Sequence, residues 1–368
     1  MASSPDRSDE TGVGIPPFAA TRFVTVRPAR ATLEAGRTLQ LTASLKSGKQ
    51  ASFTWISSNP SVARVSSTGL VTAVAPGSTT ITATSGGRSG TSTVTVTAPP
   101  SPPSAGSAVL LAAGDISSCS SSGDEATASL LDGLQGTVAT LGDNTYPDGT
   151  ASQFANCYAP TWGRHRARTR PSPGNHDYHT SGGAEYYSYF GANAGPSGRG
   201  YYSYDLGGWH IVSLNSNVSM SAGSAQERWL RADLAASTKT CTLAYWHHPR
   251  FSSGTKHGDF SAAQPIWQAL YDYKAEVVLS GHEHNYERFA PQSPSGAADP
   301  ANGIRKFVVG TGGRSHYDDL GTPKANSQVF NGTTFGVLQL TLGSASYSWR
   351  FIPVAGQSFT DSGTGSCR

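Results

Sequence analysis

A proline-rich stretch divides the chain into two regions with different hydrophobic patterns. Residues 98–107 read APPSPPSAGS, in which four of ten residues are proline and none is a large apolar residue. This composition favours an extended, semi-rigid spacer. The chain of 368 residues is long enough to build one hydrophobic core on each side of the spacer. We therefore expect two domains, residues 21–97 and 108–368, joined by a linker at 98–107.

The region before the linker has the pattern of short β-strands. Its segments TLQLTASL, ASFTWISS, TTITATS and STVTVTA alternate apolar and polar residues, and turn signals at 67–69 and 75–78 separate them. Strands at this spacing predict an all-β sandwich. The stretch WISSNPSVARVSSTGLVTAVAPGSTTITAT resembles the bacterial immunoglobulin-like domains. That resemblance implies a spacer or attachment module that contacts a cell surface or a carbohydrate. Residues 21–97 contain no histidine or cysteine, so we expect no chemistry there.

Beyond the linker, apolar runs alternate with amphipathic segments. The runs SAVLLAA, GTVATL, WHIVSL, CTLAYW, AEVVL and KFVVG read as buried strands. A helix is predicted at 124–134, and two more begin with the spacing of a capping box, at Ser224 with Glu227 and at Ser261 with Gln264. Strands interleaved with helices predict an α/β or mixed sandwich whose sites lie at strand ends.

Metal-type donor residues follow five of the predicted strands directly. They are Asp115, Asp143, Tyr146, Asn175, His247, His282 and His284. Because strand ends of one polarity gather along one edge of a sheet, we expect these side chains to share a pocket. Two carboxylates buried together are costly unless cations lie between them. The pattern therefore predicts a metal site.

The donor set favours two ions over one. Imidazole combined with carboxylate suits Zn, Fe or Mn, whereas Ca²⁺ prefers oxygen ligands alone. Six or seven donors are too many for one tetrahedral ion and fit two ions that share a bridging carboxylate. His282 and His284 are alternate residues after a strand, so they point to opposite sides and can each serve a different ion.

Five motifs together resemble the calcineurin-like metallophosphoesterases, and within them the purple acid phosphatase group. They are GD at 114–115, GDNTY at 142–146, GNHD at 174–177, YWHHP at 245–249 and GHEH at 281–284. The resemblance covers residues 109–351 and implies an α/β (α+β) four-layer sandwich with mixed sheets. Many metallophosphoesterases carry a histidine where this chain has Ser117. Tyr146 instead matches the GDxxY of the purple acid phosphatases, and its phenolate favours Fe(III).

The resemblance implies a role for each motif residue. One metal, Fe(III), would be held by Asp115, Asp143, Tyr146 and His284. The second, a divalent Zn, Fe or Mn ion, would be held by Asp143 as the bridge and by Asn175, His247 and His282. His176 would contact the phosphate, with Asp177 orienting its ring. His257, ten residues after His247, lies where the group carries a general acid. Glu287 and Arg288 are interpreted as a pair that supports the metal ligands from behind, or as an ordinary ion pair without a role in the site.

These roles predict a binuclear metal-dependent phosphohydrolase that cleaves phosphomonoesters through attack of metal-bound hydroxide. Its partner would be a small phosphate ester, since a net charge of +3 is too small to argue for nucleic acid. One alternative is a phosphodiesterase or nucleotide-cleaving activity on the same site. Another is a surface binding protein with an inert phosphatase domain. Five further histidines have no motif support and are interpreted as structural or solvated: His165, His179, His210, His248 and His316.

The cysteines bear on the cellular compartment. None of Cys119, Cys157, Cys241 and Cys367 lies in a CxxC pair, which argues against a structural zinc site. We predict the disulfides Cys119–Cys157 and Cys241–Cys367 among three pairings, with four buried free thiols as the alternative. The first residues, MASSPDRSDETG, lack the apolar core of a signal peptide. The sequence also contains no run of eighteen apolar residues, the length needed to span a membrane. Disulfides favour a secreted, cell-surface or periplasmic protein whose numbering begins after a removed signal.

Overall fold

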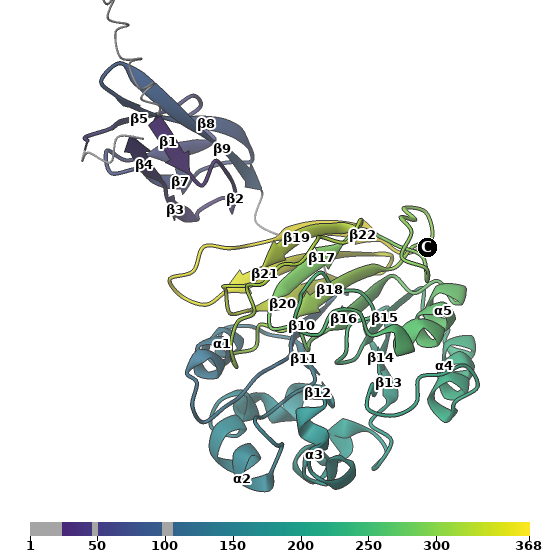
Figure 1. Cartoon of the computed structure of the whole chain (residues 1–368). Helices are drawn as coiled ribbons and strands as arrows, with labels where there is room; N and C mark the ends of the chain where they lie inside the picture. Colours follow the sequence, from purple (N-terminus) through teal and green to yellow (C-terminus); the bar gives the residue numbers. More distant parts are fainter. Residues whose placement is uncertain (1–23, 46–50, 98–105) are drawn as a thin grey trace, which may run out of the picture. The chain divides into compact units, whose positions relative to one another are not determined.

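The computed structural model describes residues 24–45, 51–97 and 106–368. The chain separates into two compact units, Met1–Pro99 and Pro100–Arg368. Most of the predicted linker lies outside the described residues, which resume at 106. Each unit is drawn in Figure 1, and each has a core of its own.

The first unit is a β-sandwich, as predicted. Its strands are β1 Val24–Arg27, β2 Arg30–Glu34, β3 Thr38–Gln40, β4 Thr42–Leu45, β5 Thr54–Ser57, β6 Ala63–Val65, β7 Leu70–Ala73, β8 Gly77–Ser85 and β9 Arg88–Thr97. They form sheets ordered β2-β9-β8-β5, β3-β7-β6 and β1-β4. The segment TLQLTASL was predicted as one strand, but the structure divides it into β3 and β4 at the buried Leu41. Strand β3 pairs with β7, whereas β4 pairs with β1. Alternation of side chains explains the core, because Ile81, Ala83, Val94 and Val96 all point inward.

The second unit contains two mixed sheets. The six-stranded sheet has the order β12 Thr169–Ser172, β11 Thr137–Leu141, β10 Ala108–Ala113, β20 Gly336–Leu342, β21 Ser346–Pro353 and β22 Ser362–Ser366. The seven-stranded sheet has the order β13 Tyr202–Leu206, β14 Trp209–Ser213, β15 Cys241–Tyr245, β16 Val277–Ser280, β18 Arg305–Val309, β17 Tyr286–Phe289 and β19 Ser327–Asn331. Strands β10, β11 and β12 are parallel neighbours, and so are β14, β15, β16 and β18. The carboxyl ends of each parallel set therefore meet at one edge.

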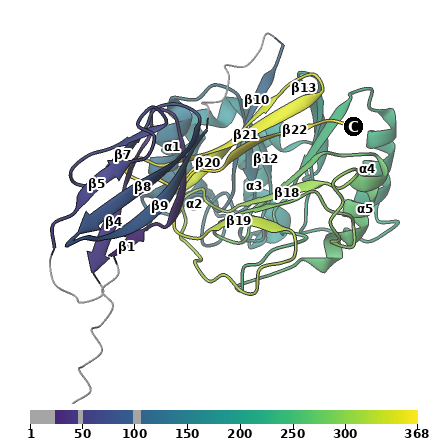
Figure 2. The same ribbon diagram turned by 90° about the horizontal axis from the view of Figure 1, so that it is seen from above.

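Helices cover the outer faces of the two sheets. α1 Gly123–Asp132, α2 Ala151–Gln153 and α3 Ala184–Phe190 lie on the side of β11 and β12, while α4 Ala225–Ala236 and α5 Gln264–Asp272 lie beside β14 to β16 (Figures 1 and 2). Trp209 and Ile211 of β14 join the core between the sheets, and Val212 joins the core under α4 and α5. The central strands are thus buried on both faces, which explains their continuous apolar runs. The mixed α/β sandwich expected for 108–368 is the fold observed.

The helix starts were predicted less well than the strands. The Ser224 hydroxyl accepts the Glu227 N–H at 3.2 Å, but the Glu227 carboxylate accepts the Gly223 N–H, so only half of that capping box forms. The second predicted box is wrong, because Ser261 begins a short 3₁₀ turn, Ser261–Ala263, ahead of α5. The other short helical turns are Phe154–Tyr158, Trp162–Arg168, His176–Tyr178, Ser181–Gly183 and Gly191–Ala194.

Two disulfides close the second unit. Cys119 is bonded to Cys157 and Cys241 to Cys367, which confirms the predicted pairing and excludes four free thiols. The Cys119–Cys157 bond encloses the segment that carries Asp143 and Tyr146. No helix in the described part of the chain has the length and apolar character needed to cross a membrane.

Candidate metal centre

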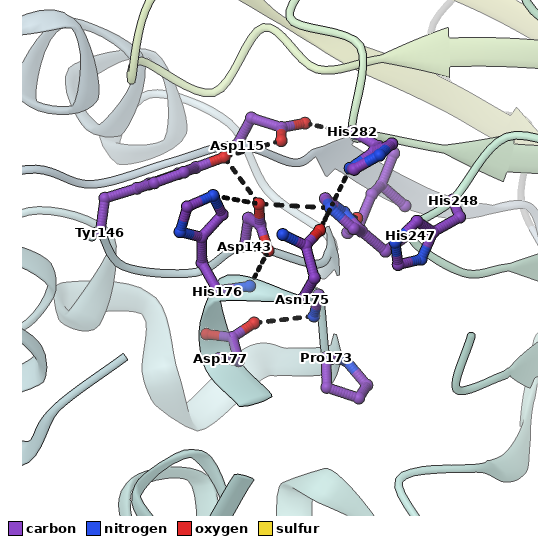
Figure 3. A network of polar contacts seen from close by, with 12 residues as sticks. Asp115, Asp143, Tyr146, Pro173, Asn175, His176, Asp177, His247, His248 and His282 are labelled. Carbon is purple, nitrogen blue, oxygen red and sulfur yellow. Dashed lines mark hydrogen bonds and ion pairs between the residues drawn. The ribbon is translucent and has the colours of Figure 1, made fainter. Parts of the chain in front are cut away.

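Five strand ends deliver the predicted donors to one place. Asp115 and Asp143 come two residues after β10 and β11, Asn175 three residues after β12, and His247 and His282 two residues after β15 and β16. The first three come from one sheet and the last two from the other. Their side chains point toward one another across the edge where both parallel sets end (Figure 3). The structure therefore brings together all the donors that the sequence placed at strand ends.

The glycines that precede the donors are required by the crowding of this edge. A β-carbon on Gly174, before Asn175, would lie 2.1 Å from Asp143 Oδ1. One on Gly281, before His282, would lie 2.6 Å from Asp115 Oδ2. Any side chain at either position would displace a carboxylate. The recurring glycine–donor dipeptides thus reflect backbone packed directly against the donor atoms.

Three donors have left-handed backbones that aim their side chains inward. Asp115, Asp143 and His282 have φ angles of 60°, 50° and 73°. A non-glycine residue in this region costs on the order of 1 kcal/mol and persists only where other contacts fix it. Here Asp115 Oδ2 accepts the His282 N–H at 2.8 Å, and Asp143 Oδ1 accepts the His176 N–H at 2.9 Å. Backbone strain is concentrated where the donors meet.

One group of donors surrounds the hydroxyl of Tyr146. This hydroxyl lies 2.9 Å from Asp115 Oδ1, 2.8 Å from Asp143 Oδ2 and 3.1 Å from His284 Nε2. Burial, with the added charges of Asp115 and Asp143, raises the pKa of Tyr146 well above its usual value. The phenol therefore stays protonated in this environment unless a cation compensates the charge.

A second group of donors surrounds Nε2 of His247. This atom lies 3.1 Å from Asn175 Oδ1, 3.1 Å from His282 Nδ1 and 3.3 Å from Asp143 Oδ2. The other ring nitrogen, Nδ1, lies 2.8 Å from the carbonyl oxygen of Leu141, the contact of an N–H donor. Without a metal ion, a proton on Nε2 meets the facing carboxylate and amide oxygens, and a bound cation would take the place of that proton. Such a convergence of acceptors fits a bound cation.

Asp143 Oδ2 belongs to both groups. It touches the Tyr146 hydroxyl and lies in ion-pair range of His247. Burial opposes a charge on His247, but the carboxylate of Asp143 outweighs it and raises the His247 pKa to about 9. Burial would likewise raise the pKa of Asp143, yet the contact with His247 holds it below its usual range. Asp143, His247 and His282 also form a cluster whose ligand atoms all lie within 4.8 Å of one another.

His282 and His284 belong to different groups, as the alternation of residues predicts. His282 contacts His247, whereas His284 contacts Tyr146 and Asp115. Burial and the neighbouring His247 hold the pKa of His282 well below its usual range. His284 is oriented by Ser315, whose hydroxyl is 2.7 Å from Nδ1, and by the ring of Tyr317, stacked at 4.1 Å.

The two predicted catalytic histidines lie beside different donors of the cluster. The His176 ring is 4.3 Å from the Tyr146 ring, and the exposed His257 ring is 3.9 Å from the His282 ring. The expectation that Asp177 orients His176 is wrong. His176 Nδ1 is directed at the carbonyl oxygen of Pro147, at 2.5 Å. Asp177 instead accepts from Asn144 and from the Gly174 N–H, so it shapes the turn beneath the donors. Burial first, and then Asp143, raises the Asp177 pKa to about 7.

Several residues at the site were missed from the sequence. Glu283, fully buried between the two histidines of GHEH, accepts the N–H groups of His257 and Gly258 through Oε1, both at 2.7 Å. Its position in the motif was the available signal. Ser315 and Tyr317 follow the glycine-rich turn after β18 and carried no signal of their own.

The expected Glu287–Arg288 pair does not form. Arg288 binds Asp361 at 2.6 Å, while Glu287 accepts from the Ser253 N–H and the Ser327 hydroxyl. Adjacent residues of a strand point to opposite faces of the sheet, which separates the two charges.

Family comparisons agree with both halves of this description. Residues 20–98 match the family described as bacterial Ig-like domain (group 2), and residues 108–286 match the calcineurin-like phosphoesterases. The chain thus combines a bacterial Ig-like domain with a domain of the calcineurin-like phosphoesterase family.

Several of the curated proteins that the chain resembles are named purple acid phosphatases. Purple acid phosphatase 15 of Arabidopsis thaliana is 33% identical over 141 residues, which cover 35% of this chain and 26% of the relative. An uncharacterised protein of Mycobacterium tuberculosis is 28% identical over 203 residues, covering 44% of this chain and 38% of that protein. The chain therefore spans well under half the length of these relatives.

Solved structures support the fold. The purple acid phosphatase PPD1 from yellow lupin superimposes with a TM-score of 0.59 at 16% identity, covering 94% of this chain and 69% of that one. GAP50, an anchor in the inner membrane complex of Plasmodium, superimposes with a TM-score of 0.55 at 12% identity, covering 71% of this chain and 89% of that one. At these identities the likeness concerns the fold alone.

Proposed function

We propose that this chain is a binuclear metal-dependent phosphohydrolase that cleaves phosphomonoesters at the cluster of donors. The observation that carries the proposal is the position of Asp143 Oδ2, which belongs both to the group around Tyr146 and to the group around His247. Two adjacent groups that share a carboxylate oxygen are the arrangement that a bridged pair of ions requires.

The residues present fit the metals that the sequence predicts. Asp115, Asp143, Tyr146 and His284 would hold Fe(III), which the hard phenolate oxygen favours. Asp143, Asn175, His247 and His282 would hold a divalent Zn, Fe or Mn ion. When bound, such ions lower the pKa of water and neutralise charge on the phosphoryl group.

The chain's own side chains supply the remaining functions. The partly exposed His176 is held by contacts to Pro147 and Asp143 beside the Tyr146 ring, and it would bind the phosphoryl group there. The ring of His257 lies beside that of His282, and His257 would donate a proton to the ester oxygen that leaves. Its backbone N–H is held by the buried carboxylate of Glu283, which limits the movement of that loop.

The proposal is tested by metal analysis combined with two substrates. The purified protein should contain about two metal ions per chain and show a phenolate–Fe(III) absorption band in the visible range. It should hydrolyse nitrophenyl phosphate faster than bis-nitrophenyl phosphate. The reverse order would establish the diesterase alternative, and fewer than one metal ion per chain without turnover would establish an inert binding protein.

The role of His257 can be tested separately. His257→Ala should reduce turnover of alkyl phosphates by about 10²-fold or more, since a poor leaving group needs its proton. Nitrophenyl phosphate, whose leaving group is stable as an anion, should be much less affected. Equal losses on both substrates would contradict the general-acid role.

The two disulfides support the proposal that the protein is exported, because such bonds persist in oxidising compartments. Contact of the immunoglobulin-like domain with a cell surface or a carbohydrate is part of the same proposal. A pull-down of the full chain with cell-wall polysaccharide, compared with a chain lacking the first unit, tests that contact.

A further inference from the structure

A groove opens beside the candidate metal centre. It lies between the segment after β14, at 218–221, and the start of α5, and its volume is about 470 Å³. Val218, Met220, Phe260 and Pro265 supply its apolar walls, and Ala262 lies at its exposed rim. The polar lining is uncharged and consists of Ser219, Ser221, Ser261 and Gln264. No charged side chain is among the described residues that line it. The groove is therefore suited to a hydrocarbon group and unsuited to a second phosphate or another ion.

A series of rings connects the groove to the donors. The ring of Phe260 lies 4.8 Å from that of His248, which lies 4.3 Å from that of His282. The ring of His257 lies 3.9 Å from the same His282 ring. Phe260, His248 and His282 are each partly exposed, and His257 is exposed. The rings thus form a chain of contacts from His282 of the donor cluster to Phe260, which lines the groove.

The chemistry of the proposed reaction places the alcohol part of the ester on this same side. In hydrolysis, water oxygen bonds to phosphorus, the bond from phosphorus to the ester oxygen breaks, and that oxygen takes a proton to leave as an alcohol. His257 would give that proton, so the carbon chain attached to the ester oxygen begins near His257. Phe260 is three residues further along the same loop, anchored by its N–H to the carbonyl oxygen of Pro249 at 2.7 Å.

We propose that this groove binds the alcohol part of the substrate, and that the preferred substrates are monophosphate esters of apolar alcohols, with aryl or long alkyl groups. This inference rests on the proposed phosphohydrolase function. One occupant, the alcohol part, is argued because Phe260 and His248 link the groove to the donor cluster and no charged side chain lines the groove.

The test uses a series of n-alkyl phosphates from ethyl to octyl, whose leaving groups differ in length but hardly in acidity. In the metal-loaded full chain, kcat/KM should rise with each methylene that enters the groove, by up to about fourfold per group. Ala262→Trp, which places a large side chain at the exposed rim, should collapse the ratio of octyl to ethyl phosphate toward one. Ala235→Trp, the same change on the exposed face of α4, is the matched control and should keep the wild-type ratio.

Binding separates this inference from the proposed function. Alkylphosphonates, which cannot lose an alcohol, are titrated into the same three metal-loaded proteins by calorimetry. Affinity that rises with chain length in wild type and in Ala235→Trp, but not in Ala262→Trp, supports the groove even if no ester is turned over. Absence of turnover would then refute the phosphohydrolase alone. Affinity and kcat/KM that do not depend on chain length in the wild type would overturn the groove as a substrate site.

Discussion

The two units bury different kinds of side chain. Among the described residues of the first unit, the buried polar side chains are Glu34, Thr79 and Ser92, and the core is aliphatic. The second unit buries two adjacent aspartates, several histidines and the amine of Lys306. Both are β-rich, so strand content does not explain the contrast. We infer that the relative direction of neighbouring strands determines whether ionisable side chains at strand ends come together.

Strand pairing accounts for the contrast. Among the described strands of the first unit, all pairs but one are antiparallel, so successive strand ends lie at opposite edges of a sheet. In the second unit, parallel neighbours bring strand ends together, and two such sheets meet at one edge. Removing a donor should therefore affect metal and catalysis, whereas removing a core methyl group of the first unit should affect stability alone.

The largest effect is expected for Asp143→Ala. Because Asp143 belongs to both donor groups, its loss should reduce kcat/KM by more than about 100-fold. Residues that only support a ligand cost up to about that factor, and a ligand of both ions should cost more. The metal content should fall in parallel. Elemental analysis and phosphatase assays measure both quantities.

Ile81→Val in the first unit is the control for Asp143→Ala. It should lower the stability of that unit by about 1 kcal/mol and leave metal content and turnover unchanged. Full metal occupancy in Asp143→Ala, or metal loss in Ile81→Val, would break the contrast between the units.

The next effect concerns the disulfide between Cys119 and Cys157, two residues that are 38 positions apart in the sequence. Replacing both cysteines with alanine should lower the free energy of unfolding of the second unit by about 3–4 kcal/mol, through the greater entropy of the unfolded chain. Denaturant titration followed by tryptophan fluorescence measures this change. The first unit has no cysteine, so its own transition should stay where it is; a shift there would be contrary to expectation.

A smaller effect is expected at Glu283, which holds the loop of His257. Glu283→Ala should lower kcat on alkyl phosphates by about tenfold while KM changes little, since supporting residues contribute 10–100-fold. Glu283→Gln, which keeps an acceptor oxygen for the two N–H groups, should restore part of the loss. If Glu283 acts through His257, neither change should matter in the His257→Ala background; an additive loss there would show an independent role.

The smallest effect is a pH dependence of stability at His210, away from the metal centre. Burial would lower the pKa of His210, but the carboxylates of Asp233 and Asp205 outweigh it and raise the pKa. A raised pKa in the folded state adds stability that is complete below the unfolded value of about 6.5 and is lost as pH rises through the folded value.

His210→Asn should therefore reduce stability at pH 5.5 by no more than about 1 kcal/mol, and by less at pH 9. Denaturant titrations at the two pH values check this. A loss of stability that grows toward high pH would contradict the ion pairs as its source.

The sequence predicted much of this structure, and its failures have a common cause. Strand runs such as VATL and EVVL and the donors that follow them could be assigned because apolar runs, glycine and donor types are local signals. The roles of Asp177, Ser261 and the Glu287–Arg288 pair were assigned wrongly because each depends on the direction of one side chain or the register of one turn. Neither is recorded in residue spacing.

Other features depend on contacts between distant segments. Ser315 and Tyr317 reach His284 from a turn 31 and 33 residues further along the chain. The groove beside Phe260 is formed by segments that only the packing of α5 brings together. Such features follow from tertiary structure, and a single sequence offers no pattern from which to infer them.

Substitution of Gly174 or Gly281 offers a way to weaken metal binding without removing a ligand. Since the carboxylates of Asp143 and Asp115 occupy the space that a methyl group there would need, alanine at either position acts as a wedge between intact donors. Gly174→Ala would press on the shared aspartate. Gly281→Ala would press hardest on Asp115, with the Leu141 carbonyl oxygen and the His247 ring next in reach. A pair of single-methyl variants could thus weaken the two halves of the centre unequally and yield partly loaded protein for spectroscopy.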